Sequence, residues 1–492
     1  MDRTGIVVFS GGSAANTLVD VFGGVADQKK CPLTYIIPIS DNGGSTSELI
    51  RFFGGPGIGD VRSQSLSLFA QARLLIPGLP LSVVQTPKVR RLVRLIPEEA
   101  PGSDGEKEAV KALFNHRLAA SSEAARLEWL DIVEGRHSLW SRISSEKREL
   151  IRSFLNTINL EIVKRTRSSS IFNFQLASVG NLFLTGARIF TGSFESAIYL
   201  LGSITNVPSN VSVIPAINSN FSHHICAGLR NGDHIIGQNS ISHPTAPTTV
   251  PSTADPLTPT THRRNISKEL LEHDRVEDAN LPGSLPSLRK QYIDFQKGHV
   301  QDLPARIERI WYINPYGQEI RPHPNPKVLN ALASAQCVIY SIGSLYTSIV
   351  PCLILKEVGE AINAAHVRFR VLILNGSIDR ETGPSSLPFG AKDFVAAIAN
   401  ACASSRDPEP LIEERDWNNY VTHVIYLEGE GAPKVEKEEL RLLGIETIRL
   451  YGRRNATGGM IYDGQGLGRA LEAIMGSRDL RIDQSRRNTL QS

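Results

Sequence analysis

The sequence predicts an α/β protein built around a mainly parallel sheet. Two apolar runs near the N-terminus, residues 5–10 and 33–40, each end in a glycine-rich turn that leads into helix-compatible sequence. A third run, residues 337–342, ends in the same way at Gly343. Strands that alternate with helices form βαβ units, whose strands lie parallel in one sheet. The repeated strand–turn–helix pattern therefore indicates this fold class.

The composition indicates a folded protein without a nucleic-acid partner. Of the 492 residues, 41% are hydrophobic and 21% are charged, which is enough apolar surface for a sizeable core. This excludes a fully disordered, collagenous or coiled-coil protein. The 53 basic and 50 acidic residues leave a formal net charge of +3, so charge gives no basis for binding nucleic acid.

The N-terminal region and the cysteines predict a cytoplasmic protein. The apolar run at residues 6–9 is too short for a signal peptide, and no stretch approaches the ~20 apolar residues of a membrane span. The five cysteines are scattered and contain no CxxC pair. They are typical of buried thiols in a reducing compartment, not of disulfides or a zinc site. We therefore expect no membrane partner and no metal site.

The other expected elements continue the α/β rhythm, with a helical insertion and a hairpin. Residues 105–167 are charged and carry apolar residues at helical spacing, which predicts inserted helices. Residues 225–229 and 234–237 flank an Asn-Gly turn, the pattern of a β-hairpin. Further strands are expected at 209–217, 306–313, 369–374 and 421–426, and helices at 326–336, 349–364 and 393–403. Pro38 is awkward inside a central strand, so the second run is expected to end early.

We predict a single domain, residues 1–475, followed by a flexible polar tail, residues 476–492. Residues 244–262 contain five prolines and seven threonines. Such a segment cannot bury enough apolar surface to offset the entropy of ordering. The region 240–290 around it is therefore predicted to be a disordered surface loop.

The three glycine-rich turns are the candidate chemical site. Ligands bind at the carboxyl ends of strands in open parallel sheets, and free N–H groups at helix starts favour phosphate. Plain tight turns and helix caps are the alternative for any one turn taken alone. The candidate phosphate-binding residues are Gly11, Gly12, Ser13, Asn42, Gly43, Gly44, Ser45, Gly343, Ser344, Leu345, Tyr346, Thr347 and Ser348. Neither the dinucleotide-binding glycine spacing nor the P-loop consensus occurs, which disfavours an ordinary dehydrogenase or P-loop ATPase.

Four polar residues near these turns are further candidates. Asp41 follows the second run directly, where a carboxylate can reach ribose hydroxyls, a metal or an acceptor hydroxyl; a turn aspartate is the alternative. In the glycine-rich loop 54–62, Arg62 is suited to a phosphate and Asp60 to Mg²⁺ through water. Asn181 is expected at the start of a helix, where it either caps the helix or binds the ligand through its side-chain amide. The adjacent histidines 223–224 point to opposite faces of a strand and would not grip one ion.

These loops together resemble the CofD/YvcK family, which contains a phospholactate transferase and the bacterial gluconeogenesis factor. The eukaryotic, fungal-type branch is the most similar, and the resemblance covers about residues 4–465 outside the proline/threonine loop. The matching stretches are Phe9–Ser13, Ser40–Ser45, Pro56–Arg62, Val179–Leu182 and Ile342–Ser348 with Pro351.

The resemblance implies a Rossmann-like, three-layer α/β/α fold with a nucleotide or nucleotide-sugar diphosphate across these strand ends. Gly11, Gly12 and Ser13 would contact phosphate, and Asp41 and Asn42 would contact the ligand or acceptor, with residues 343–348 as a second wall. Two departures stand out. Many bacterial members have paired aspartates where this chain has Asp41 and Asn42. In addition, residues 63–90 have no counterpart, and a lineage insertion or a translated intron would explain them.

Three functions are therefore expected from different classes. The first is a regulator that binds a nucleotide sugar of the UDP-sugar type and acts in carbon metabolism without turnover. The second is a transferase that moves a phosphoryl-linked group from a nucleoside diphosphate to an alcohol, with Mg²⁺ and with Asp41 as the catalytic carboxylate. The third is a non-catalytic scaffold. The sequence leaves a homo-oligomer open.

Overall fold

A seven-stranded sheet lies at the centre of the computed structural model, which describes residues 4–11, 17–40, 44–57, 105–167, 170–205, 207–242, 285, 288, 302–407, 412–454 and 459–488. Its order is β11-β10-β9-β8-β1-β2-β3, and every neighbouring pair is parallel. The strands are β1 (Gly5–Phe9), β2 (Leu33–Ile37), β3 (Val211–Pro215), β8 (Ala335–Tyr340), β9 (Phe369–Ile373), β10 (His423–Leu427) and β11 (Glu446–Leu450). The predicted mainly parallel α/β fold is confirmed.

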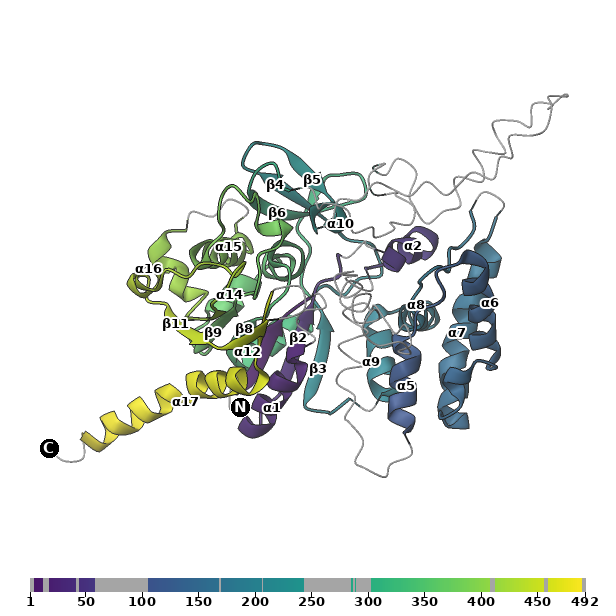
Figure 1. Cartoon of the computed structure of the whole chain (residues 1–492), viewed down its shortest axis with the longest axis horizontal. Coiled ribbons are helices and arrows are strands. Elements are labelled where there is room, and N and C mark those ends of the chain that lie inside the picture. The colour runs from purple at the N-terminus through teal and green to yellow at the C-terminus, as the bar shows by residue number, and fades with distance from the viewer. Residues whose placement is uncertain are drawn as a thin grey trace.

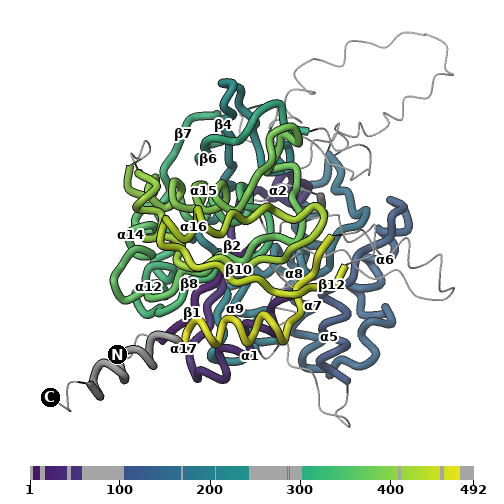
Figure 2. Tube along the Cα trace, turned by 60° about the vertical axis from the view of Figure 1, so that its left-hand side comes forward, coloured from purple at the N-terminus to yellow at the C-terminus, as the bar shows by residue number. Residues whose placement is uncertain are grey.

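Helices cover both faces of this sheet, so its central strands are buried on both sides. All residues of β1, β9 and β10 are buried, as expected for a parallel sheet between two helical layers. Helices α1 (Val19–Lys29) and α17 (Gly464–Asn488) pack together, and α12 (Pro326–Ser334), α14 (Val358–Asn363) and α15 (Ala391–Ser404) form a second contiguous layer (Figures 1 and 2). Right-handed crossovers place the two layers on opposite faces, because the chain leaves β1 in one direction and β8 in the other.

A second, antiparallel sheet lies at the top of Figure 1, away from the two marked ends of the chain. Its order is β5-β4-β6-β7, formed by β4 (His224–Leu229), β5 (His234–Ile236), β6 (Ile307–Ile313) and β7 (Glu319–Ile320). The expected hairpin is confirmed: β4 and β5 pair antiparallel, and Gly232 at the turn has a φ of +88°. The short helix α10 (Gln238–Ser242) follows β5 and packs near it.

The helical insertion is confirmed as α5 (Glu106–Asn115), α6 (Ser122–Glu134) and α7 (Ser145–Arg165), the blue helices of Figure 1. It leads into α8 (Val179–Thr191) and α9 (Phe194–Ile204), and α9 packs against β3. Helices α7 and α8 approach closely at Gly186, where an added Cβ would lie 2.1 Å from the backbone oxygen of Phe154. Helix α8 therefore joins the insertion to the rest of the fold.

Several elements differ in detail from expectation. Strand β2 ends at Ile37, just before Pro38, in agreement with the predicted early end. The single helix expected at residues 349–364 is divided into α13 (Val350–Leu353) and α14, with Glu357 between them at a φ of +66°. Helix α17 continues past the predicted tail boundary at residue 476. Residues 63–90, and nearly all of the predicted loop 240–290, lie outside the described residues.

Two further findings concern the predicted environment of the chain. No helix in the described part of the chain has the length and apolar character that crossing a membrane requires. All five cysteines are buried and free, as the sequence predicted. The described part of the chain also contains a short antiparallel pair, β12 (Gly452–Arg454) and β13 (Met460–Tyr462), and the helices α2 (Gly44–Phe53) and α16 (Lys437–Leu442).

Candidate functional site

The candidate site lies where the winding of the sheet reverses. From β1 the chain proceeds to β2 and β3 on one side, and from β8 it proceeds to β9, β10 and β11 on the other. The carboxyl ends of β1 and β8 therefore flank the topological switch point, where ligands bind in open α/β sheets. The first and third predicted turns follow these two strands. The fold thus places them side by side, as the sequence-based argument requires.

The two turns touch through backbone. A Cβ built on Gly11 would stand 2.5 Å from the Ser348 Cβ and 2.6 Å from its Oγ, so only glycine fits this position without movement. Gly343 has a φ of +140°, and its added Cβ would lie 2.9 Å from the Gly11 carbonyl oxygen. This contact brings together Gly11 and residues 343–348 among the predicted site residues.

The third turn, the π-helical turn η4 (Leu345–Ile349), is held from outside by two polar side chains. Asn375, just after β9, accepts from the Gly343 N–H and donates to the Gly343 carbonyl, both at 2.8 Å. Glu381 accepts from the N–H groups of Tyr346 and Thr347, both at 3.1 Å, through one carboxylate oxygen. These three amides are consequently engaged within the protein, which leaves fewer N–H groups for phosphate than the turn pattern alone suggested.

Glu381 is the centre of a buried network. It is 1% exposed, and its second carboxylate oxygen accepts from the Thr347 hydroxyl at 2.6 Å and the Ser242 hydroxyl at 2.5 Å. The carboxylate therefore has donors on both oxygens, which is how a buried charge is stabilised. Ser242 belongs to α10, so Glu381 joins the turn after β8 to the short helix that follows β5 of the antiparallel sheet.

The second predicted turn leads into α2, which carries a buried ion pair whose two side chains also bind the segment after the helical insertion. Arg51 forms a two-pronged contact with Glu48, with both N–O distances at 2.7 Å. Glu48 also accepts from the Asn173 N–H at 2.7 Å, and Arg51 donates to the Ser170 hydroxyl at 3.0 Å. These contacts tie α2 to the segment after the helical insertion.

Arg188 on α8 is a buried cation beside the turn that follows α2. It is 9% exposed, donates to the Gly54 carbonyl at 3.0 Å and lies against Gly55, where an added Cβ would be 2.5 Å from the guanidinium. Burial, with a smaller effect of Arg165, lowers the pKa of Arg188 to about 10, so it remains charged at neutral pH. No carboxylate of the described residues pairs with it, and its Nε has no hydrogen-bond partner.

Several of the other predicted site residues lie outside the part of the chain that the structure describes. Gly12, Ser13, Asp41, Asn42, Gly43, Asp60 and Arg62 are not among the described residues, and for Gly44 and Ser45, at the start of α2, only the backbone is described. Asn181 is fully buried in the first turn of α8, after the N-cap residue Ser178. Its N–H donates to the Ser178 carbonyl at 3.0 Å. The cap role suggested for Asn181 is therefore wrong, because Ser178 occupies the N-cap position, while its ligand role and the roles of the other residues stay predictions.

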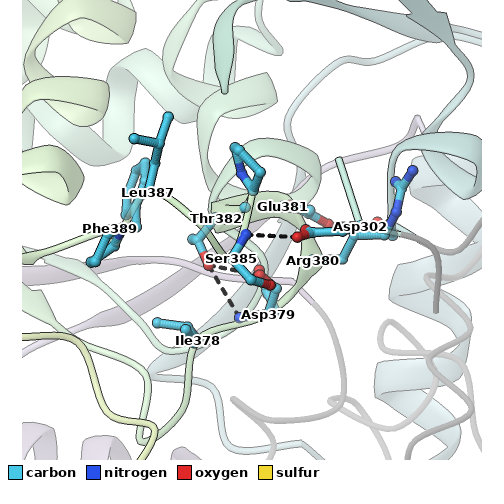
Figure 3. A pocket seen from close by; sticks show the side chains of 13 residues that line it. Asp302, Ile378, Asp379, Arg380, Glu381, Thr382, Ser385, Leu387 and Phe389 are labelled. Carbon is cyan, nitrogen blue, oxygen red and sulfur yellow. Dashed lines mark hydrogen bonds between the residues drawn. The ribbon is translucent and has the colours of Figure 1, made fainter. Parts of the chain in front are cut away.

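A pocket of about 290 Å³ adjoins Glu381 (Figure 3). Its lining comes from the loop between β9 and α15, from α10, and from Asp302. Asp302 accepts from the Ser385 N–H at 2.7 Å, and this bond is the main reason that the pKa of Asp302 is lowered. The lining residues are Ser242, Asp302, Ile378, Asp379, Arg380, Glu381, Thr382, Gly383, Pro384, Ser385, Leu387, Pro388 and Phe389.

One cluster in the described residues has side chains close enough to share a metal ion: His116, Glu128 and His137 in the helical insertion. Glu128 lies 2.6 Å from His116 Nε2, and it also accepts from the Ala119 N–H at 2.7 Å. The Leu139 N–H donates to His137 Nδ1 at 3.2 Å, which leaves the proton of neutral His137 on Nε2. That nitrogen therefore has no lone pair for a metal. We interpret the cluster as a hydrogen-bond network that connects the end of α5 to α6. Its nitrogen ligands also do not suit Mg²⁺.

Sequence reasoning missed Asn375, Glu381 and Arg188. Asn375 follows a predicted buried strand and precedes a glycine, so the rule applied to Asp41 would have found it. Arg188 is the one charged residue of the apolar segment 179–191, and a single charge in an apolar helix indicates a buried functional group that the sequence could have pointed to. Glu381 has no such signal, because its partners Ser242 and Thr347 are distant in the sequence and meet only through the fold.

The fold and the switch-point turns define a doubly wound, Rossmann-like α/β protein. The sequence model of a family described as 2-phospho-L-lactate transferase CofD matches residues 6–450. Because that match spans most of the chain, the protein belongs to the CofD family, as the resemblance in its loops indicated.

Two relatives and one solved protein illustrate the relationship. The chain is 38% identical over 435 residues to the uncharacterized protein YNL011C of Saccharomyces cerevisiae. This aligned region covers 86% of this chain and 90% of that protein. It is 28% identical over 142 residues to the gluconeogenesis factor of Bacillus subtilis, covering 27% and 44% of the two chains. Two crystal structures of protein BH3568 from Bacillus halodurans, one described as a member of the UPF0052 family, match with TM-scores of 0.53 and 0.51. Both are 18% identical over 96% of this chain and 99% of the other, which supports the fold.

Proposed function

We propose that this protein binds a nucleotide or a nucleotide sugar of the UDP-sugar type across the carboxyl ends of β1, β2 and β8, and acts in carbon metabolism in the cytoplasm. The observation that carries the proposal is the close approach, at the switch point, of Gly11 to Gly343 and to the side chain of Ser348. The similarity to a gluconeogenesis factor supports the metabolic part.

The charges and polar groups around the switch point support a phosphate-bearing ligand. Helices α1 and α2 begin shortly after β1 and β2, so their N-terminal N–H groups face the carboxyl edge of the sheet. Arg188 supplies a buried positive charge near the turn after α2, and the Gly57 N–H donates to the Ile39 carbonyl at 2.9 Å, which places this turn at the end of β2. Arg188 has no counter-ion among the described residues, and an anionic ligand would offset the cost of burying its charge.

The test is a thermal-shift series on the full chain with UDP-sugars, GDP, GTP, NAD(P) and phosphoenolpyruvate, each with and without Mg²⁺. A ligand at 100 times its Kd stabilises the fold by about 2.7 kcal/mol, which is a visible shift. We expect a UDP-sugar to raise the midpoint without Mg²⁺. Gly11→Ala should abolish the shift because its Cβ separates the two turns, whereas Gly23→Ala, which meets nothing within 4 Å, should keep it.

Absence of a shift with every compound would contradict the proposal and favour a scaffold function. A shift that requires both a guanosine nucleotide and Mg²⁺ would instead favour the transferase.

The transferase is the second candidate because the matching family is described by that activity. In this reaction the acceptor oxygen bonds to phosphorus, the bond to the nucleoside monophosphate breaks, and Asp41 takes the hydroxyl proton. Mg²⁺ would neutralise the diphosphate when bound. Asp41→Asn should then abolish release of nucleoside monophosphate with a modest loss of binding. Normal release by that variant would show that Asp41 is not the base.

A further inference from the structure

We propose that the pocket beside Glu381 receives an uncharged, hydroxyl-bearing group, such as the sugar of a nucleotide sugar, and rejects an anionic one. The inference rests on the proposed function, since the same ligand would place its phosphates at the turns after β1 and β8. It adds the chemical class of the second half of the ligand, which the turns themselves do not specify.

The position of the pocket connects it to the switch-point turns. Glu381 lines the pocket and also binds the N–H groups of Tyr346 and Thr347 in η4. The pocket wall and the turn after β8 therefore share one carboxylate. A ligand that crosses the carboxyl edge from β1 toward β9 reaches the loop between β9 and α15 next. At about 290 Å³ the pocket lies at the lower limit of small-molecule sites, so it suits a single ring and not a whole nucleotide.

The charge of the lining disfavours an acidic ligand. Three carboxylates, Asp302, Asp379 and Glu381, face one guanidinium, Arg380. Arg380 donates to the carbonyls of Ser240 and Ile241, so it is engaged in holding α10. Arg380 interacts electrostatically with Asp302 and Glu381 and offsets one of the three negative charges, so the lining keeps a formal charge of −2, which disfavours a phosphate or carboxylate in the pocket.

Asp302 is suited to hydroxyl donors, whereas both oxygens of Glu381 already accept two hydrogen bonds each. Each oxygen of Asp302 accepts one backbone N–H, from Leu303 at 2.9 Å and from Ser385 at 2.7 Å, and each carboxylate oxygen can accept a further hydrogen bond. Figure 3 shows the Asp302 and Asp379 side chains near the centre of the pocket, with Leu387 and Phe389 on one side and Arg380 on the other. Polar acceptors beside apolar surface match a sugar ring, which carries hydroxyls at its edge and C–H groups on its faces.

Two other occupants fit less well. A metal ion would need several carboxylates around one point, and in the described part of the chain the pocket carboxylates form no group of three close enough for that. An apolar ligand would leave the carboxylates desolvated without donors, which is unfavourable. The exposed rim residues Ile378 and Leu387, 46% and 51% exposed, offer only a narrow apolar surface.

The test compares three probes that differ only in the group after the diphosphate. Binding of UDP, UDP-glucose and UDP-glucuronic acid to the full chain is measured by calorimetry, and the guanosine and adenosine diphosphate series are used if no uridine compound binds. We expect UDP-glucose to bind about tenfold more tightly than UDP. We also expect UDP-glucuronic acid, which adds one carboxylate, to bind about tenfold more weakly than UDP-glucose.

A rim variant tests whether this discrimination originates in the pocket. Leu387→Lys adds a cation at an exposed position, so folding is expected to be preserved, and the preference for glucose over glucuronate should fall about threefold. Leu442→Lys on α16, 84% exposed and outside the pocket lining, is the matched control and should leave the preference unchanged.

The outcomes separate the two claims. If no nucleotide in any series binds, the proposed function is wrong and this inference falls with it. If UDP binds but glucose adds nothing, or if glucuronate binds as tightly as glucose, the proposed function stands and the inference alone is overturned. An equal change of preference in Leu387→Lys and Leu442→Lys would also overturn it, since the discrimination would then not arise in this pocket.

Discussion

His224, the first residue of β4, is expected to make the free energy of unfolding decrease in mild acid. It is 5% exposed, and burial together with the neighbouring His223 lowers its pKa to about 4. The unfolded chain has a histidine pKa of about 6.5. Between these values the unfolded state binds a proton that the folded state does not, so stability is lost as the pH falls below 6.5. The loss is about 1.4 kcal/mol per pH unit until about pH 4.

Urea unfolding at pH 7, 6 and 5 measures this effect. His224→Phe removes the titrating group while keeping a buried ring, so the variant should lose less stability between pH 7 and 5 than the wild type. The exposed His234 on β5 provides the control, and His234→Phe should retain the wild-type slope. Equal slopes for the wild type and His224→Phe would contradict the assignment.

At the residue scale the sequence predicts glycines better than charged partners. Gly11 was predictable because a tight turn after a buried strand requires a small residue, and its contact with Ser348 supplies the reason. Glu381 was not, because a buried carboxylate is defined by the donors around it. Those donors come from Ser242, Tyr346 and Thr347, which only the tertiary structure brings together.

At the scale of single elements, η4 depends on a carboxylate from a different loop. Its N-cap residue Ser344 forms no side-chain cap, and Glu381 binds the amides instead. Glu381→Gln keeps the size but replaces one acceptor oxygen by an NH₂ group that faces donors. We expect a loss of about 2–4 kcal/mol in the free energy of unfolding, since hydrogen bonds to a charged group contribute about 1.5–3 kcal/mol each.

Chemical denaturation checks this value, with Glu430→Gln at an exposed position as the control. The same variant should weaken nucleotide binding, because η4 forms one side of the switch point. A stability loss within error of the control would mean that the turn is held by Asn375 alone.

The elements that the sequence predicted best are those buried on both faces. The runs that became β1, β8 and β9 are mainly apolar, with Gln336 in β8 and Arg370 in β9 as the polar exceptions, and such runs are typical of a parallel strand covered on both faces. Strand β11 was missed because it lies at the sheet edge with partly exposed residues, so its sequence is mixed. The strands that became β4 and β6 were both predicted, but their antiparallel pairing was not, since pairing is a property of two distant segments.

At the scale of the whole molecule, the helical insertion and the sheet are connected through α8. This helix packs on α5, α7 and α9 and carries both Asn181 and Arg188. Its first ten residues are all buried, so it cannot leave one partner without exposing apolar surface to water. We therefore infer that the insertion and the sheet unfold together. An independently folding insertion would instead be joined by an exposed, polar connection.

Gly186→Ala tests this coupling, because the added Cβ would lie 2.1 Å from the Phe154 backbone oxygen and force α7 and α8 apart. Overpacking of this kind costs about 1–3 kcal/mol of stability. The insertion contains Trp129 and Trp140, so with Trp311 and Trp417 replaced by Phe its fluorescence reports the insertion, while circular dichroism reports the whole chain. In Gly186→Ala, fluorescence and circular dichroism should report a single unfolding transition, with the midpoint lowered by the same amount in both signals. Gly24→Ala, which meets nothing within 4 Å on α1, should leave the midpoint equal or higher. Two separate transitions, with only the fluorescence midpoint lowered, would show that the insertion folds on its own and that α8 does not transmit its packing to the sheet.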